Sequence, residues 1–234
     1  MNKYAYELNH PGILSGVKST ILFLLLFLFP TAQLMASDKT QDNTANFIAN
    51  YYMDNRDFNT VSLIYSSKSL PYGMTLWGFT DLHSNQNSDD NRSDFTTFFT
   101  EARLSKMFKG GWGAQAEYND SMGNDNDLAR FGVIYKLPIK QFVLLRAFPL
   151  QTNGSNAQLS LAWRTTVGME QLYFEGFVDY NIVDGQTNRI VAEPQLRYML
   201  GQRHGVTVEY RLNEFLIPTS SDESGVALGF YYHF

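Results

Sequence analysis

Aromatic and ionisable side chains recur at every second position in two neighbouring stretches of the chain. The six residues concerned are Trp77, Phe79, Asp81, Phe99, Glu101 and Arg103. A spacing of two places the side chains of a β-strand on one face, so each stretch presents rings and charges together. Rings can stack on a planar molecule while the charged groups hydrogen-bond to its edge. We therefore expect these residues to form a binding station for a planar solute.

Hydrolytic chemistry has weaker support. Beyond residue 36 the histidines are His83, His204 and His233, and only His83 is followed by a serine, Ser84. Adjacent residues of a strand point to opposite faces, whereas a nucleophile and its base must share a face. We interpret His83 as a polar strand end and expect no enzyme. A lipid hydrolase acting near the membrane surface is the alternative.

Composition argues against metal, cofactor and nucleic-acid sites. The chain has no cysteine, which excludes a thiolate site. Asp89, Asp90 and Asp94 have no spacing typical of a compact calcium-binding loop, so we interpret them as part of a solvated acidic loop. The formal net charge is -5, and lysine and arginine form no dense cluster. No cofactor, metal or nucleic-acid partner is expected.

The elements that must position these residues are short segments of alternating polarity. We expect twelve strands, at residues 44–53, 60–68, 73–83, 96–108, 111–120, 128–137, 141–150, 157–167, 172–182, 189–200, 205–214 and 225–234. In the last, every second residue from Val226 to Phe234 is apolar or aromatic. Such a strand at a free sheet edge would aggregate, whereas a closed barrel leaves no edge. The final Phe234 also resembles the signal read by the bacterial barrel-assembly machinery, an expected partner.

The connections between these segments alternate in length. Long polar ones, at 84–95, 121–127, 151–156, 183–188 and 215–224, alternate with tight ones at 109–110, 138–140, 168–171 and 201–204. Outer-membrane barrels have long external loops and short periplasmic turns. The pattern predicts an all-β fold, a single transmembrane antiparallel β-barrel of about twelve strands with up-and-down topology. Both termini should lie at the periplasmic rim.

The N-terminus carries the one long apolar run, residues 21–29, which ends at Pro30. Nine residues are too few to span a bilayer, where about 20 are needed. A cleaved secretory signal peptide over residues 1–36 fits better, followed by a barrel over 37–234. The expected location is the outer membrane of a Gram-negative cell, reached through the periplasm, with its lipids as partners.

The parity of the strands assigns nearly all their charges to the lumen. A lysine or arginine on the lipid face near the bilayer midplane would cost about 2–4 kcal/mol. The charges besides those already named are Glu117, Arg130, Lys136, Arg146, Arg164, Glu175, Asp179, Glu193, Arg197, Glu209 and Arg211. Pro194 falls on the lipid face, where it removes a ladder hydrogen bond, so a bulge is expected there.

The number of strands bears on the width of the lumen. Eight strands leave an interior filled by side chains, and 16–18 leave an aqueous channel. Twelve lie between these limits and favour a narrow pore. The alternative is a non-conducting structural or adhesive barrel, in which acids neutralise bases across the lumen and aromatic side chains fill it.

Several strands resemble those of a known family. The stretches are Leu76-Trp-Gly-Phe-Thr-Asp81, Phe98-Phe-Thr-Glu-Ala-Arg-Leu-Ser105, Val191-Ala-Glu-Pro-Gln-Leu-Arg197 and Val208-Glu-Tyr-Arg211. They are similar to strands of the nucleoside-specific channels of the outer membrane (Tsx-like). The resemblance implies passive diffusion of small solutes, nucleosides among them, through a narrow lumen where aromatics stack on nucleobases and ionisable groups hold the sugar. The residues that match by motif are Phe79, Asp81, Phe99, Glu101 and Arg103.

Overall fold

The computed structural model describes residues 45–86, 95–122, 127–152, 156–213 and 224–234. The strands are β1 (Ala45–Asp54), β2 (Phe58–Leu70), β3 (Met74–Asn85), β4 (Phe95–Met107), β5 (Trp112–Ser121), β6 (Leu128–Lys136), β7 (Phe142–Gln151), β8 (Ala157–Val167), β9 (Met169–Ile182), β10 (Arg189–Ala192), β11 (Gln195–Met199), β12 (His204–Asn213) and β13 (Ser224–His233). The largest difference from the predicted boundaries is at β9, which begins at Met169 rather than at residue 172. The predicted signal peptide lies outside the described residues.

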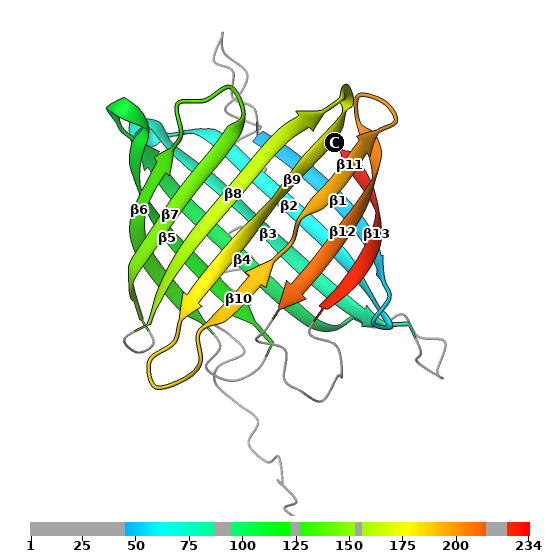
Figure 1. Cartoon of the computed structure of the whole chain (residues 1–234), viewed down its shortest axis with the longest axis horizontal. Helices are drawn as coiled ribbons and strands as arrows, with labels where there is room; N and C mark the ends of the chain where they lie inside the picture. Colours follow the sequence, from blue (N-terminus) through cyan, green and yellow to red (C-terminus); the bar gives the residue numbers. More distant parts are fainter. Residues whose placement is uncertain (1–44, 87–94, 123–126, 153–155, 214–223) are drawn as a thin grey trace, which may run out of the picture. The chain divides into compact units, whose positions relative to one another are not determined.

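The strands form one closed antiparallel barrel (Figure 1). Strands that follow one another in sequence are paired, except that β10 and β11 both lie between β9 and β12. The barrel closes because β13 pairs with both β12 and β1. Closure leaves no strand edge, which is the condition for a sheet to cross hydrocarbon. The prediction of a twelve-stranded transmembrane barrel is confirmed, because β10 and β11 are two halves of one strand.

The interruption between β10 and β11 falls at Glu193 and Pro194. The register does not shift across it: Ala192 faces Val178 and Gln195 faces Glu175, a spacing of three residues on both strands. The expectation of a bulge is therefore wrong: the strand is interrupted at this point, but it has no extra residue relative to β9. Tyr210 N–H donates to the Pro194 carbonyl over 3.0 Å, and proline has no N–H to return.

Connections of different length gather at the two ends of the barrel. We call the end with connections 86–94, 122–127, 152–156, 183–188 and 214–223 the loop end. The turn end has connections 71–73, 108–111, 137–141, 168 and 200–203. The first hairpin is an exception, because its three residues 55–57 make a tight connection at the loop end. β1 starts and β13 finishes at the turn end, as predicted for the two ends of the barrel.

The outer and inner faces have opposite character. Along β12 the outward Val206, Val208 and Tyr210 are exposed, while the inward Glu209 and Arg211 are buried. Exposed apolar side chains around a polar interior are the reverse of a water-soluble protein and match a lipid environment. Helical structure among the described residues is limited to two short 3-10 turns, Pro71–Gly73 and Lys109–Gly111. No helix there could cross a membrane.

Candidate solute-binding lumen

Three aromatic rings form a continuous series on the inner wall at β3 and β4. The ring centroids of Phe79 and Phe99 lie 5.6 Å apart with planes tilted by 45°, and Trp77 and Phe79 are also 5.6 Å apart. We call Trp77, Phe79 and Phe99 the aromatic ladder. Phe79 faces Glu101 and Phe99 faces Asp81, so the two phenylalanines contact each other diagonally rather than directly across the strands.

The charged residues predicted for this site surround the ladder. Arg103 lies opposite Trp77, and its guanidinium carbon is 4.9 Å from the centre of the indole ring. Its Nε donates to Glu117 Oε2 over 2.8 Å and lies 2.6 Å from Glu101 Oε1. The structure thus brings together all six residues of the two stretches. The ladder offers ring faces, and the charges beside it offer hydrogen-bonding groups to a solute.

A balanced set of charges crosses the middle of the lumen, and we call it the central cluster. Its six members are Glu101, Arg103, Glu117, Arg130, Arg146 and Asp179. Arg130 Nη1 donates to Glu117 Oε1 over 2.6 Å, so Glu117 accepts from arginines on both neighbouring strands. Asp179 on β9 interacts electrostatically with Arg103 on β4, five strands away in the sheet. Three acids therefore meet three bases.

The lumen is narrow at this height because inward side chains fill it. Glu117 is 2% exposed, Glu209 1% and Phe148 0%. Such exposures are those of a protein interior rather than of a wide water-filled channel. Any solute passing here must move between the side chains of the central cluster and the ladder.

A second group of charges lies toward the loop end, across the seam where the barrel closes. Arg211 Nη1 donates to Thr60 Oγ1 over 3.0 Å and lies 3.7 Å from Asp54 Oδ2. Arg211 also contacts Glu209, and its guanidinium carbon sits 4.7 Å above the Tyr52 ring. These residues come from β12, β1 and β2, on both sides of β13. The sequence analysis did not identify the ion pair between Arg211 and Asp54, because Asp54 lies one residue beyond the predicted first strand.

Small residues of β13 make this contact possible. The inward positions of β13 in this region are Gly225, Ala227 and Gly229. A Cβ on Gly229 would lie 2.5 Å from the Tyr52 ring, and one on Gly225 would lie 2.4 Å from Arg56 Nε. Side chains of β1 and β12 therefore meet over β13. The signal was present in the sequence as small residues alternating with large outward ones.

Toward the turn end, Glu175 joins two arginines. Arg164 Nε lies 3.2 Å and Arg197 Nη1 2.9 Å from its carboxylate. Each guanidinium also stacks on a tyrosine, Arg164 on Tyr173 at 4.5 Å and Arg197 on Tyr231 at 4.3 Å. The remaining predicted lumen acid, Glu193, lies at the break between β10 and β11 and interacts with Glu209 and Arg211.

His83 lies in the lumen rather than at the lipid surface. Its Nδ1 is 3.0 Å from Thr60 Oγ1, and its ring meets Phe58 edge to face at 5.6 Å. Thr60 is fully buried. A hydrolase pairing of His83 with Ser84 gains no support from this arrangement. Asp89, Asp90 and Asp94 lie outside the described residues.

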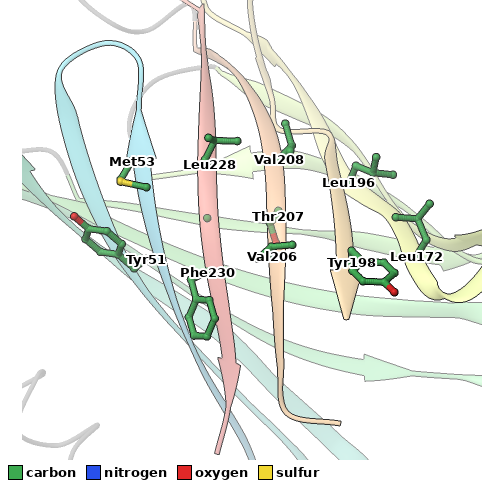
Figure 2. A pocket seen from close by; sticks show the side chains of 11 residues that line it. Tyr51, Met53, Leu172, Leu196, Tyr198, Val206, Thr207, Val208, Leu228 and Phe230 are labelled. Atoms are coloured by element: carbon green, nitrogen blue, oxygen red, sulfur yellow. The ribbon is translucent and has the colours of Figure 1, made fainter. Parts of the chain in front are cut away.

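The outer wall carries an apolar groove of about 480 Å³ across β1, β13, β12, β11 and β9 (Figure 2). One row of its walls is Tyr51, Phe230, Val206 and Tyr198, and the other is Met53, Leu228, Val208 and Leu196. Members of each row are direct neighbours on adjacent strands. The groove faces away from the lumen and has the character of a lipid-facing surface.

Comparisons with known proteins agree on the architecture. No protein-family model matches the chain, and no curated protein matches it. Among solved structures, a KdgM porin is similar with a TM-score of 0.51 and 16% sequence identity, over 81% of this chain and 99% of the porin. The Salmonella typhi outer membrane phospholipase (OMPLA), a dimer with bound calcium, has a TM-score of 0.52 at 13% identity, over 83% and 94% of the two chains. At such identities the likeness concerns the fold: the chain is a β-barrel of the outer-membrane type.

Proposed function

We propose that this protein is a channel of the Gram-negative outer membrane through which small solutes diffuse passively. The observation that carries the proposal is the aromatic ladder, which lies with its surrounding charges on the inner wall of a transmembrane barrel. Membrane lipid covers the outer wall, including the groove of Figure 2. The solute enters at one end of the lumen and meets the ladder before it leaves at the other.

The ladder favours solutes with a planar face. Stacking of a nucleobase on an aromatic side chain contributes about 1–3 kcal/mol per base. A site of that strength retains a solute briefly and still lets it leave, as conduction requires. Nucleosides are the class that the family resemblance implies, with the charges beside the ladder hydrogen-bonded to the sugar hydroxyls.

Liposome swelling tests the proposal directly. Purified barrels are refolded into liposomes, and swelling rates are measured in nucleosides, sugars and amino acids of similar size. We expect swelling with all three classes of solute. At low solute concentration, swelling should be fastest with nucleosides. Swelling no faster than in protein-free liposomes would contradict the channel. Equal rates for all solutes would leave a channel without the proposed preference.

The ladder itself is tested by the double variant Phe79→Ala, Phe99→Ala in planar bilayers. Loss of stacking should weaken block of the current by a nucleoside at least about fivefold, while small-ion conductance stays the same or rises. The matched control is Phe131→Ala, Phe230→Ala, which removes two exposed rings from the lipid face. Unchanged block in the ladder variant would mean that these rings only pack.

A closed barrel is the second candidate, because the central cluster is so deeply buried. Such a protein would serve as a structural or adhesive element and would show no conductance steps in a planar bilayer. Discrete steps from the wild-type protein decide in favour of the channel.

A further inference from the structure

Arg164 differs from the other paired arginines of the lumen in its exposure. Its side chain is 50% exposed, whereas those of Arg103, Arg130, Arg197 and Arg211 are 7–10% exposed. Arg164 nevertheless has the inward parity, since it lies directly between Phe142 on β7 and Glu175 on β9. Its guanidinium is therefore open to the lumen near the turn end.

Neighbouring groups form an arc with Arg164 along the inner wall. Lys136, the last residue of β6, has its Nζ 5.9 Å from the Phe142 ring. Arg164 stacks on Tyr173 and contacts Glu175, which in turn contacts Arg197. We call Lys136, Arg164, Glu175 and Arg197 the cationic arc. A guanidinium stacked on an aromatic face keeps its N–H groups in its own plane, parallel to the ring, where their edges are free to meet a ligand from the side.

The arc carries more positive than negative charge. The arc contains three cations and one carboxylate, and that carboxylate pairs with two of them: it lies 2.9 Å from Arg197 and 3.2 Å from Arg164. The central cluster, by contrast, has equal numbers of acids and bases. Arg164 is thus the most exposed of the ion-paired arginines in the lumen, and Lys136 makes no ion pair with any residue that the structure describes.

The rim at the turn end has the same sign. Its described strand ends and connections carry Lys68, Lys106, Lys109, Lys140 and Arg203, against Glu170. A ring of one sign around an opening raises the local concentration of ions of the opposite sign. Anions are therefore favoured at the opening closest to the arc.

We propose that the cationic arc is an anion-binding station, which takes the carboxylate or phosphate of a solute in the lumen. Arg164 binds the anionic group with its exposed N–H groups, and Lys136 adds a second positive charge. Glu175 and Arg197 hold the Arg164 guanidinium in place against Tyr173. The proposal rests on the proposed channel and extends its solutes to acidic ones.

The test compares pairs of solutes that differ by one anionic group. Adenosine is compared with adenosine monophosphate, and glucose with gluconate, as blockers of the current in planar bilayers. We expect the wild-type protein to be blocked by the anionic member at several-fold lower concentration. A preference in both pairs indicates an arc that accepts either anion, and a preference in the first pair alone indicates one selective for phosphate.

Two variants with opposite expected effects on block by the anionic solute make the test specific. Arg164→Gln should weaken block by adenosine monophosphate about tenfold and leave adenosine unaffected, since it removes a charged hydrogen-bond donor. Glu175→Gln should strengthen block by adenosine monophosphate, because it removes the only carboxylate of the arc while the glutamine oxygen can still accept a hydrogen bond from Arg164. Arg203→Gln, a change of the same kind on the exposed rim, is the control and should have little effect on either solute. Equal block by the two members of both pairs, or an unchanged preference in Arg164→Gln, would overturn the proposal.

Calorimetry separates this proposal from the channel. Binding of adenosine monophosphate to the detergent-folded barrel does not require conduction, and slower migration after boiling confirms that each variant is folded. Heat of binding in the wild-type protein that is lost in Arg164→Gln supports the arc even if no current is seen. If the protein conducts but shows neither a preference for anionic solutes nor binding of adenosine monophosphate, the proposed channel is supported and the proposed anion-binding station is refuted.

Discussion

Glu117 shows how much of the lumen depends on single carboxylates. It accepts hydrogen bonds from Arg103, Arg130 and Asn119 and is almost completely buried. We expect Glu117→Gln to lower the free energy of unfolding by about 3–5 kcal/mol, because the two arginines lose their shared partner inside the barrel. Urea unfolding of the refolded barrel in lipid vesicles measures the change.

The control for this variant is Glu170→Gln, an exposed residue at the start of β9. A surface substitution of this kind is expected to alter stability by no more than about 0.5 kcal/mol. Similar effects of the two substitutions would mean that water, rather than Glu117, satisfies Arg103 and Arg130.

Sequence reasoning succeeded for individual residues where a local rule applied. The two-residue period of a strand placed Phe79, Phe99 and Arg103 on one face, because a charge cannot face hydrocarbon cheaply. It could not find the bond from Arg211 to Thr60, which are 151 positions apart. That contact exists only because the barrel closes, and because β13 presents only Gly225, Ala227 and Gly229 to the lumen there.

At the scale of elements, the break at Pro194 requires an adaptation of β9. Gly176 faces Pro194 with a φ of 150°, and a Cβ there would lie 2.3 Å from the Glu193 carbonyl oxygen. We expect Gly176→Ala to destabilise the barrel by at least about 1–3 kcal/mol, because it combines backbone strain with a clash. Urea unfolding again provides the measurement.

Gly201→Ala is the matched control, because its new Cβ would meet only the flexible His204 ring at 3.2 Å. Equal stability of the two variants would show that β10 and β11 can move away from β9.

The elements themselves were largely predictable, and the exceptions have physical reasons. Alternating polarity marks each strand, since one face meets lipid and the other the lumen. Alternating polarity cannot distinguish a bulge from an interruption at Pro194, because both remove one ladder hydrogen bond. The two differ only in how residues are paired with the neighbouring strands. The tight first hairpin at the loop end was also not predicted, because hydrophobic patterning does not fix the length of a connection.

For the whole molecule, closure by β13 was predictable from the aromatic C-terminal strand. Removing residues 224–234 should abolish the folded form, since β1 and β12 would be left with unpaired backbone groups in hydrocarbon. The measurement is gel migration with and without boiling, where the wild-type band should shift and the truncated one should not. A heat-modifiable truncated protein would show that β1 and β12 can pair directly.

The pairing of β1 with β13 also determines how far an exopeptidase can digest the chain. The Phe234 amide donates to the Phe47 carbonyl over 3.0 Å, and the two rings lie 5.3 Å apart. Segments at the ends of a fold usually fray first, but Phe234 is bonded to β1. Digestion by a carboxypeptidase should therefore stop at Phe234 in the intact barrel, and release of this residue should report that β1 has separated from β13.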